Sequence, residues 1–456
     1  MSPETGSAEP GRAATLAAAG RPELLRAVGD HPGGRELLEL ASGRDDVALV
    51  GGAVRDLLLG RRPRELDVVV ARGAAELARE LASRLGVLAG QSPDERLELT
   101  FHERFRTALV RWSGGQIDVA TRRAESYPAP GALPEVREGT IEEDLRRRDF
   151  TVNAIAVPLS GPERGTPMPV NAQALPDLHA RRLRVLHERS FIEDPTRLLR
   201  LARYRARLGF DVEPGTAELA AAAVAAGALQ TISGARIGAE LRLALGETDA
   251  VAALAAMDDL GLLSALHPRL RCHEHLARAG LKLLPAAERG EEKRPRPDLL
   301  VLAALLQPML HGLQGGAEDA AGALLEHLQF PAADCELVLR AAICADATAE
   351  ALARAEAPSE IHEAASFESL EGIALAGAWG GLQGVGLGEA AHAAREWLAD
   401  LRNVSLMITG EDLIAEGIPQ GPEIGRRLAA ALARKLDGEL ADGRQAELEA
   451  ALEVVL

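Results

Sequence analysis

Short blocks of apolar residues, each ended by glycine or proline, organise the first part of the chain. The apolar segment 47–50 runs into Gly51 and Gly52, which predicts a strand that ends in a turn. Segment 54–59 has the length and composition of a short helix, and the β-branched segment 68–70 predicts a second strand. The pattern therefore predicts a strand, a glycine turn, a helix and a second strand in succession.

Further patterns predict two more strands and two more helices nearby. Segments 107–112 and 116–120 have the composition of strands, and the Ser-Gly-Gly turn between them predicts a hairpin. Apolar residues recur at helical spacing over 22–40 and 74–85. The segment 130–138 is rich in proline and glycine, which predicts a loop.

Helical spacing replaces strand patterns in the rest of the chain. Asp194 and Pro195 form a helix start, and Gly209 marks the end of that helix. Leu- and Ala-rich sequence predicts mainly helix beyond it, so the fold class we expect is α+β. The next predicted helices are 216–226, 234–245 and 250–263.

Composition indicates a globular protein with more than one domain. At 456 residues the chain is too long for one compact core. Aromatic residues make up 3%, which favours helices packed through leucine and alanine, and no apolar run reaches the ~20 residues of a membrane span. The N-terminus lacks a signal-peptide pattern, and Cys272, Cys335 and Cys344 show no paired spacing. We therefore expect a cytoplasmic protein with no membrane segment.

The distribution of charge along the chain is more informative about binding partners than the net charge. The net charge of −17 argues against a general nucleic-acid binder. Segment 181–207, however, holds nine arginines and three acidic residues, a local balance of 9 − 3 = +6. Such a patch can bind phosphates with salt-sensitive affinity. The alternative is a solvated helix face, which would normally mix both signs.

Three carboxylates form a candidate metal site. Glu65 and Asp67 lie two positions apart in a predicted strand, so both side chains point to the same face. Asp118, in the second strand of the predicted hairpin, can complete a two-metal site. Gly51 and Gly52 leave room for a phosphate, and carboxylate oxygens suit Mg²⁺. This combination predicts metal-assisted phosphoryl or nucleotidyl transfer.

Segment 49–70 resembles motif A of the class II tRNA nucleotidyltransferase and bacterial poly(A) polymerase family. The family pattern is Gly-Gly-x-Val-Arg-Asp, then Leu-Gly-Arg, then Asp-x-Asp. The first metal-binding Asp of that pattern is Glu65 here. The matching residues are Gly51, Gly52, Val54, Arg55, Asp56, Leu59, Gly60, Arg61 and Asp67.

Motif B of the same family resembles segment 147–154, which reads RRDFTVNA. Arg147 and Arg148 can clamp phosphates, Asp149 can accept from a ribose hydroxyl, and Asn153 can bond neighbouring backbone. The alternative is a surface cluster of charges at a helix end. From motif A, the resemblance implies that Gly51, Gly52 and Arg55 cradle the triphosphate, and that Glu65, Asp67 and Asp118 hold Mg²⁺.

The Glu-Asp-x-x-Arg motif D of the family resembles Glu193, Asp194 and Arg197. A carboxylate accepts from an amino group while a guanidinium donates to the adjacent ring nitrogen, so such a pair admits cytosine and adenine and rejects uracil and guanine. The alternative is that Asp194 caps a basic helix, and one residue can serve both roles. Arg200 and Arg203 of that helix complete the predicted nucleotide-binding set.

The resemblance implies a polymerase β-like head with a sheet of about five strands, followed by an elongated helical neck, body and tail. It implies template-independent addition of CMP and AMP, from CTP and ATP, to the 3′ end of tRNA. Alternatives are a poly(A) polymerase, a CC-only or A-only enzyme, or an inactive RNA-binding homologue, suggested by Glu65 and by glycines lost near residue 172. The oligomeric state stays open. The predicted parts are a disordered 1–20, head 21–160, neck 161–245, body 246–400 and tail 401–456.

Overall fold

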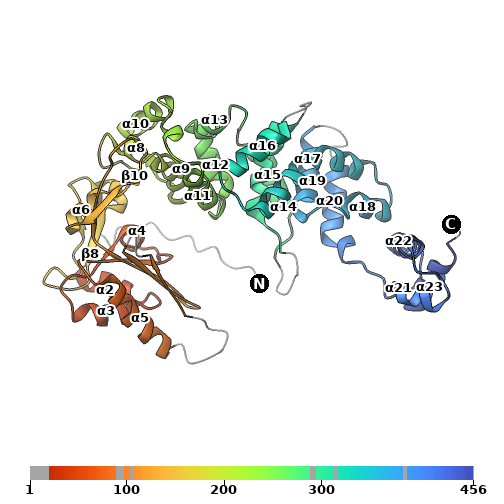
Figure 1. Ribbon diagram of the computed structural model, residues 1–456, viewed down its shortest axis with the longest axis horizontal. Helices are drawn as coiled ribbons and strands as arrows, with labels where there is room; N and C mark the ends of the chain where they lie inside the picture. The colour runs from red at the N-terminus through yellow and green to blue at the C-terminus, as the bar shows by residue number, and fades with distance from the viewer. Residues whose placement is uncertain are drawn as a thin grey trace. The chain divides into compact units, whose positions relative to one another are not determined.

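The computed structural model describes residues 20–88, 97–102, 106–287, 294–311, 317–383 and 388–454. The predicted disordered segment 1–20 lies, except for its last residue, outside them. The chain divides into two compact units, Met1–Ile232 and Ser233–Leu456, and each is described by itself (Figure 1). The finer division into head, neck, body and tail stays a prediction.

A mixed sheet of seven strands forms the centre of the first unit, in the order β3-β4-β5-β2-β1-β8-β9. About five strands were expected, and the sequence pattern placed four of them, which correspond to β1, β2, β4 and β5; β8 and the two edge strands, β3 and β9, were not placed. The two-residue β9 is too short to leave a sequence pattern, and β3 is largely exposed. The strands are β1 (Ala48–Val50), β2 (Leu66–Val70), β3 (Glu98–His102), β4 (Thr107–Trp112), β5 (Gly115–Thr121), β8 (Ile155–Pro158) and β9 (Met168–Pro169).

One neighbouring pair in this sheet, β2 and β5, is parallel, while the other pairs are antiparallel. The parallel register sets Leu66 beside Ile117 and Asp67 beside Asp118. The predicted hairpin is confirmed, because β4 and β5 pair from Thr107 to Trp112. The apolar cluster that packs the sheet against α6 (Ile141–Arg146) comprises Ala48, Val50, Val69, Leu145 and Ala156.

The first helix after β1 begins earlier than the sequence predicted. Helix α4 (Gly51–Leu58) starts at the first glycine, with Val50 as its N-cap, so no turn separates the strand from the helix. Gly51 has a φ of +70°, a left-handed conformation that favours glycine. The β1–α4 connection is therefore tight, and it directs the N-terminus of α4 towards the start of β2.

Two other predictions for this unit were wrong. Segment 22–40 forms two helices, α2 (Arg21–Gly29) and α3 (Gly34–Ser42), because Gly33 adopts a φ of +72° between them. A Cβ at Gly33 would also lie 2.9 Å from the Trp112 ring. Segment 130–138 was expected to be a loop, but its end forms β7 (Glu135–Glu138), paired with β6 (Arg123–Ser126).

Three further helices predicted for the first unit are present, whereas the short helices Ala174–His179 and Ser190–Glu193 were not predicted. Helix α9 (Thr196–Leu208) ends at Gly209, which has a φ of +66° as a C-terminal cap. Helix α5 (Ala74–Leu88) continues past Gly86, where a stop was expected. The other elements are η2 (Thr151–Asn153), α7 (Ala174–His179), β10 (Arg182–Leu183), α8 (Ser190–Glu193), β11 (Asp211–Val212), α10 (Pro214–Ala225) and η3 (Ala228–Thr231).

In its described residues the second unit is helical throughout (Figure 1). The predicted helix 250–263 is divided at Gly261, whose φ is +72°. Of the helices in the described residues, none has the length and apolar character needed to cross a membrane. The first helices of this unit are α11 (Gly234–Leu245), α12 (Ala250–Asp259), α13 (Leu262–Leu266), α14 (Glu274–Leu283), α15 (Pro297–Leu310) and α16 (Ala317–His327). They are followed by α17 (Ala332–Arg354), α18 (Pro358–Ala365), α19 (Leu370–Gln383), α20 (Glu389–Ala399), η4 (Leu401–Asn403), α21 (Gly410–Ala415), α22 (Pro422–Leu436) and α23 (Arg444–Leu452).

Candidate functional site

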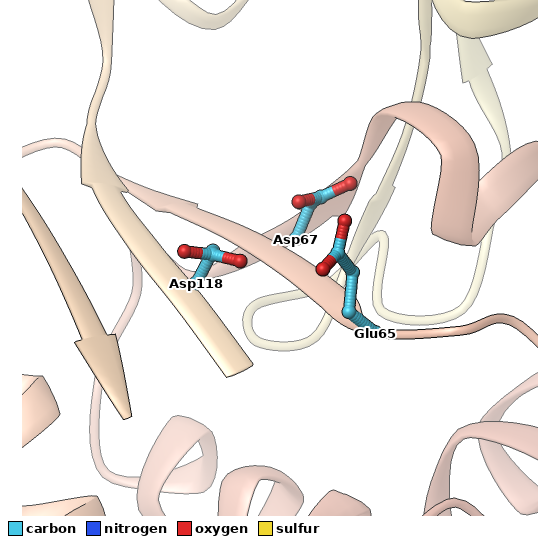
Figure 2. Close-up of side chains that lie close together, drawn as sticks. All are labelled: Glu65, Asp67 and Asp118. Atoms are coloured by element: carbon cyan, nitrogen blue, oxygen red, sulfur yellow. The ribbon is translucent and has the colours of Figure 1, made fainter. Parts of the chain in front are cut away.

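Three predicted carboxylates converge at one end of the β2–β5 pair. Glu65, Asp67 and Asp118 each offer an oxygen, and these oxygens all lie within 4.8 Å of one another (Figure 2). The parallel register places Asp67 directly beside Asp118, and Glu65 precedes the first residue of β2. The longer side chain of Glu65 therefore reaches the cluster from the entry of the strand.

The electrostatics of this cluster favour a bound cation. Burial, and next the Glu65 carboxylate, raise the pKa of Asp67 to about 7. Burial and the neighbouring Asp118 also raise the pKa of Glu65. Like charges at this distance repel, and a hard divalent cation with oxygen ligands would offset the repulsion. The donor set thus fits such a cation.

An amide that sequence reasoning did not single out joins two of these carboxylates. Gln116 Nε2 donates to Glu65 Oε2 at 2.9 Å and to Asp118 Oδ2 at 2.8 Å. Its position two residues before Asp118 on the same strand puts both side chains on one face. The sequence spacing alone could have indicated that Gln116 lies beside Asp118. Its contact with Glu65 follows only from the register of β2 and β5.

The N-terminus of α4 lies beside the carboxylate cluster. A Cβ built on Gly51 would lie 2.8 Å from Arg148 Nη1 and 3.3 Å from Asp67 Oδ2. A side chain here would therefore push against both groups, in addition to the strain of the positive φ. The free backbone N–H groups of a helix start and a guanidinium together form a site for an anion such as a phosphate.

A buried carboxylate orients the two arginines of motif B. Asp144 is fully buried and accepts from Arg147 Nη2 at 2.7 Å and from Arg148 Nη2 at 3.0 Å. Arg147 Nη1 also donates to Glu125 Oε1 at 3.2 Å. Although burial opposes ionisation, the charges of Arg148 and Arg147 keep the pKa of Asp144 below its ordinary value. Sequence reasoning missed Asp144; its spacing of three and four residues from the arginines was the available signal.

Arg55, which was predicted to help cradle the triphosphate, is buried, and its role in phosphate binding stays a prediction. Its side chain is 1% exposed, and Nη1 donates to Asn153 Oδ1 at 2.7 Å. Its Nε donates to Asp56 Oδ1 at 2.8 Å, and the guanidinium lies 5.5 Å from the centre of the Tyr204 ring. Gly51 and Arg55 are four residues apart and therefore share a face of α4, and a Cβ built on Gly52 would lie 3.5 Å from Arg55 Nη2. In this structure Arg55 links motif A to motif B and α9.

Asp149 and Asn153 of motif B are also held by internal contacts. Arg200 donates to Asp149 Oδ2 from Nη2 at 2.7 Å and from Nε at 2.9 Å, while Asn153 Nδ2 donates to Oδ1 at 2.9 Å. Burial raises the pKa of Asp149, but the Arg200 charge and these hydrogen bonds outweigh it and lower the pKa to about 2. A contact of Asp149 with ribose stays a prediction.

We expect Asp149→Asn to destabilise the first unit by about 2 kcal/mol at pH 7, because the folded pKa lies about two units below the unfolded value. A depressed carboxylate pKa contributes stability that is complete above about pH 4 and is lost as the pH falls towards 2. The difference in thermal midpoint between wild type and Asp149→Asn should therefore be largest at pH 7 and shrink at pH 3. A difference of equal size at both values would contradict this role.

The residues of motif D lie at the start of α9. Asp194 Oδ1 accepts from the Thr196 backbone N–H at 3.1 Å, so its carboxylate binds the first residue of α9, although the N-cap of that helix is Pro195 and not Asp194 as predicted. Arg197 is 3% exposed, and it donates to Ser190 Oγ and to the Arg147 carbonyl, each at 2.7 Å. These bonds bring motif D against motif B. Reading of a base by this pair stays a prediction.

The other predicted nucleotide-binding residues surround one aromatic ring or the start of α9. Arg200 and Arg203 lie 5.5 Å and 5.0 Å from the centre of the Tyr204 ring. Glu193 accepts from Arg189 Nε at 3.2 Å. Arg203 is buried, so its guanidinium supports the helix packing and not an open surface.

Two family models match the chain. The model described as the poly A polymerase head domain matches residues 47–183, a range that contains the carboxylate cluster and motif B. The model described as a probable RNA- and SrmB-binding site of polymerase A matches residues 209–273. The two matched ranges follow one another along the chain.

Curated relatives match about half of the chain. The chain is 40% identical over 225 residues to an A-adding tRNA nucleotidyltransferase of Geobacter sulfurreducens. This match covers 49% of this chain and 24% of that protein. It is 38% identical over 263 residues to a CC-adding tRNA nucleotidyltransferase of Deinococcus radiodurans, covering 57% and 66% of the two chains. The match thus spans about a quarter of the first relative and about two thirds of the second.

Solved structures resemble the whole chain. A CCA-adding enzyme in an apo form has a TM-score of 0.74 and 28% identity, covering 96% of this chain and 97% of that chain. The Thermotoga maritima CCA-adding enzyme complexed with tRNA has a TM-score of 0.71 and 26% identity, covering 95% and 98%. The similarity therefore includes the helical second half, where sequence motifs are sparse.

Proposed function

Since the chain belongs to the class II tRNA nucleotidyltransferase and bacterial poly(A) polymerase family, we propose that it adds nucleotides to the 3′ end of tRNA without a template. The observation that carries the proposal is the cluster of Glu65, Asp67 and Asp118 beside the start of α4 and Arg148. A cation-binding cluster next to an anion site is the arrangement that transfer of a nucleotide from its triphosphate requires.

Each group in the site has a proposed part. Glu65, Asp67 and Asp118 would hold Mg²⁺, which, when bound, supplies positive charge to the reacting phosphate and to the attacking hydroxyl. The N–H groups of α4 and the guanidinium of Arg148 would bind the phosphates of the incoming nucleotide. Asp144 keeps Arg148 pointed at that place. The side chains thus bind and orient both substrates.

The substrates we propose are CTP, ATP and a tRNA that lacks its 3′-terminal CCA. Similar structures contain tRNA, CTP or ATP bound to CCA-adding enzymes, which supports this set. All three cysteines are free, as expected of a cytoplasmic enzyme. Asp194 would accept a hydrogen bond from the amino group of cytosine or adenine, and Arg197 would donate one to the adjacent ring nitrogen.

Replacement of Arg197 tests this selection. Arg197→Ala should lower the use of both CTP and ATP and weaken the rejection of UTP, because the donor to the ring nitrogen is lost. A bidentate polar contact to a base edge is worth ~1 to 3 kcal/mol, or roughly five- to 150-fold in discrimination. The measurement is kcat/KM for CTP, ATP and UTP on one tRNA substrate.

A control must separate base selection from packing, since Arg197 is buried and also bonds Ser190. Ser190→Ala removes that internal partner and should leave the CTP/UTP ratio unchanged. Melting curves of both variants report any loss of fold. If Arg197→Ala retained the wild-type CTP/UTP ratio, motif D would act as a helix cap alone.

A second candidate function is addition of the terminal A alone, or of CC alone. The similar proteins include A-adding enzymes from four organisms and a CC-adding enzyme. The residues of the site are compatible with each, because all use the same transfer step.

One assay distinguishes these functions. Transcripts ending before, within and after CCA are incubated with each labelled nucleoside triphosphate and Mg²⁺. Completion of every transcript to CCA supports the main proposal. Extension restricted to transcripts that end in CC identifies an A-adding enzyme. Arrest after the second C identifies a CC-adding enzyme, and long adenosine tails identify a poly(A) polymerase. No incorporation with any substrate would overturn the proposed function.

A further inference from the structure

The residues around the carboxylate cluster form two adjacent rows across three strands. Arg111 on β4 lies opposite Gln116 on β5, and the register Leu66 to Ile117 places Glu65 next along the same row. The second row contains Asp118 and Asp67, also neighbours in register. Residues two apart in a strand share a face, so both rows lie on the same side of the sheet.

The first row is linked by hydrogen bonds that use every polar atom of the Gln116 amide. Its Nε2 donates to Glu65 Oε2 at 2.9 Å and to Asp118 Oδ2 at 2.8 Å. Its Oε1 accepts from Arg111 Nε and from Nη2, both at 3.1 Å. An amide has two N–H donors and one carbonyl oxygen with two lone pairs, so the group is satisfied completely.

The neighbours of this amide fix which way it points. A flipped amide would set its oxygen against two carboxylates and its N–H groups against a guanidinium, and both contacts would be repulsive. Arg111 thereby holds the carbonyl oxygen, and the amide nitrogen is left to face the carboxylates. Each of these carboxylates uses one oxygen for the amide and retains a second oxygen for a cation.

Glu65 needs such a restraint more than an aspartate would. Its side chain has one more rotatable bond than aspartate, and fixing that bond at a ligand position costs conformational entropy. A hydrogen bond of the ligand to a neighbouring side chain reduces the number of positions open to it. Gln116 supplies this bond at the place where the chain departs from the Asp-x-Asp pattern.

We propose that Gln116 is a positioning residue that holds Glu65 and Asp118 in place to bind the divalent cation, and that Arg111 orients the Gln116 amide. The proposal rests on the metal centre of the proposed function. It assigns Gln116 no contact with either substrate. Its effect is on cation affinity, and the transfer step depends on it through Glu65 and Asp118.

The test measures Mn²⁺ binding to the full chain by electron paramagnetic resonance, without nucleotide or tRNA. Gln116→Met retains the length of the side chain and removes both donors. Loss of a hydrogen bond to a metal ligand typically weakens metal affinity ~10- to 100-fold, so we expect the Mn²⁺ dissociation constant to rise at least about tenfold. The matched control is Gln445→Met in the second unit. It removes an exposed hydrogen bond of 2.9 Å from the side-chain amide to Glu449 Oε1. That control should bind Mn²⁺ as the wild type does.

A double variant separates positioning from loss of fold. Glu65→Asp shortens the ligand, so Gln116→Met combined with Glu65→Asp should bind Mn²⁺ more tightly than Gln116→Met alone. A disrupted sheet would not show this recovery, and melting curves in a chelator report the fold of each variant. Wild-type or tighter binding by Gln116→Met overturns the proposal, as does failure of the double variant to recover affinity.

The same titration distinguishes this proposal from the proposed function. Asp67→Asn should abolish the Mn²⁺ binding seen in the wild type. If wild type binds no Mn²⁺ that depends on Asp67, the metal centre is wrong and both proposals fail. If wild type binds Mn²⁺ at this cluster but extends no tRNA, the proposed function fails while the Gln116 variants still decide the positioning role.

Discussion

Asp67→Asn is expected to reduce nucleotide incorporation by about a thousandfold or more, since a bound cation contributes several kcal/mol to stabilising the transition state. Asp67 lies at the centre of the cluster, with its Oδ2 near the start of α4. Asparagine has the same size as aspartate but is a poor ligand for Mg²⁺ because it carries no charge. The measurement is a single-turnover rate of CMP and AMP addition at saturating Mg²⁺.

The fold should survive this replacement. Burial and the Glu65 carboxylate already raise the pKa of Asp67 to about 7, so removal of its charge relieves repulsion in the cation-free protein. The thermal midpoint in a chelator is therefore expected to stay the same or rise. Asp211→Asn, at an exposed aspartate of the same unit, serves as the control. Incorporation by Asp67→Asn within about tenfold of wild type would refute the metal-site assignment.

Glu65→Ala is expected to lose nearly as much activity as Asp67→Asn, roughly a hundredfold or more by the same reasoning on metal ligands. The structure places its carboxylate within 4.8 Å of the other two ligands, so the extra methylene does not remove it from the cluster. If Glu65→Ala incorporated nucleotides as wild type does, Glu65 would be no ligand.

The shorter substitution, Glu65→Asp, gives the complementary result. Mg²⁺ demands near-octahedral geometry, whereas Mn²⁺ accepts looser oxygen sites. An aspartate here restores the Asp-x-Asp pattern and should retain or raise activity with Mg²⁺. The three variants at positions 65 and 67 are assayed side by side with each metal. A loss with Mg²⁺ that Mn²⁺ rescues would show that this strand entry is built for the longer side chain.

Local sequence predicted the elements that form the site better than it predicted their contacts. Strand periodicity placed Glu65 and Asp67 on one face, and the Ser-Gly-Gly turn predicted the hairpin that carries Asp118. The helix at Asp194 and Pro195 also ends where Gly209 predicted. These features depend on a few consecutive residues, and physical rules for turns and caps act on that scale.

Features that depend on distant segments were not predictable in this way. Gln116 becomes a partner of Glu65 through the register of β2 and β5, which are 51 residues apart at that contact. Arg55 was expected to face phosphates, but contacts with Asn153 and Tyr204 draw it into the core. The short edge strand β9 pairs with β8 without a periodic pattern of its own.

The position of β1 in the sheet has a consequence for synthesis of the chain. Its two neighbours are β2, which follows within 20 residues, and β8, which begins at Ile155. All three residues of β1 are buried, so until β8 leaves the ribosome the nascent chain presents an apolar strand with one unpaired edge. Motif B immediately precedes β8. When β8 pairs with β1, the arginines of motif B have therefore already been synthesised. A product truncated before Ile155 is prone to aggregate through the unpaired edge of β1.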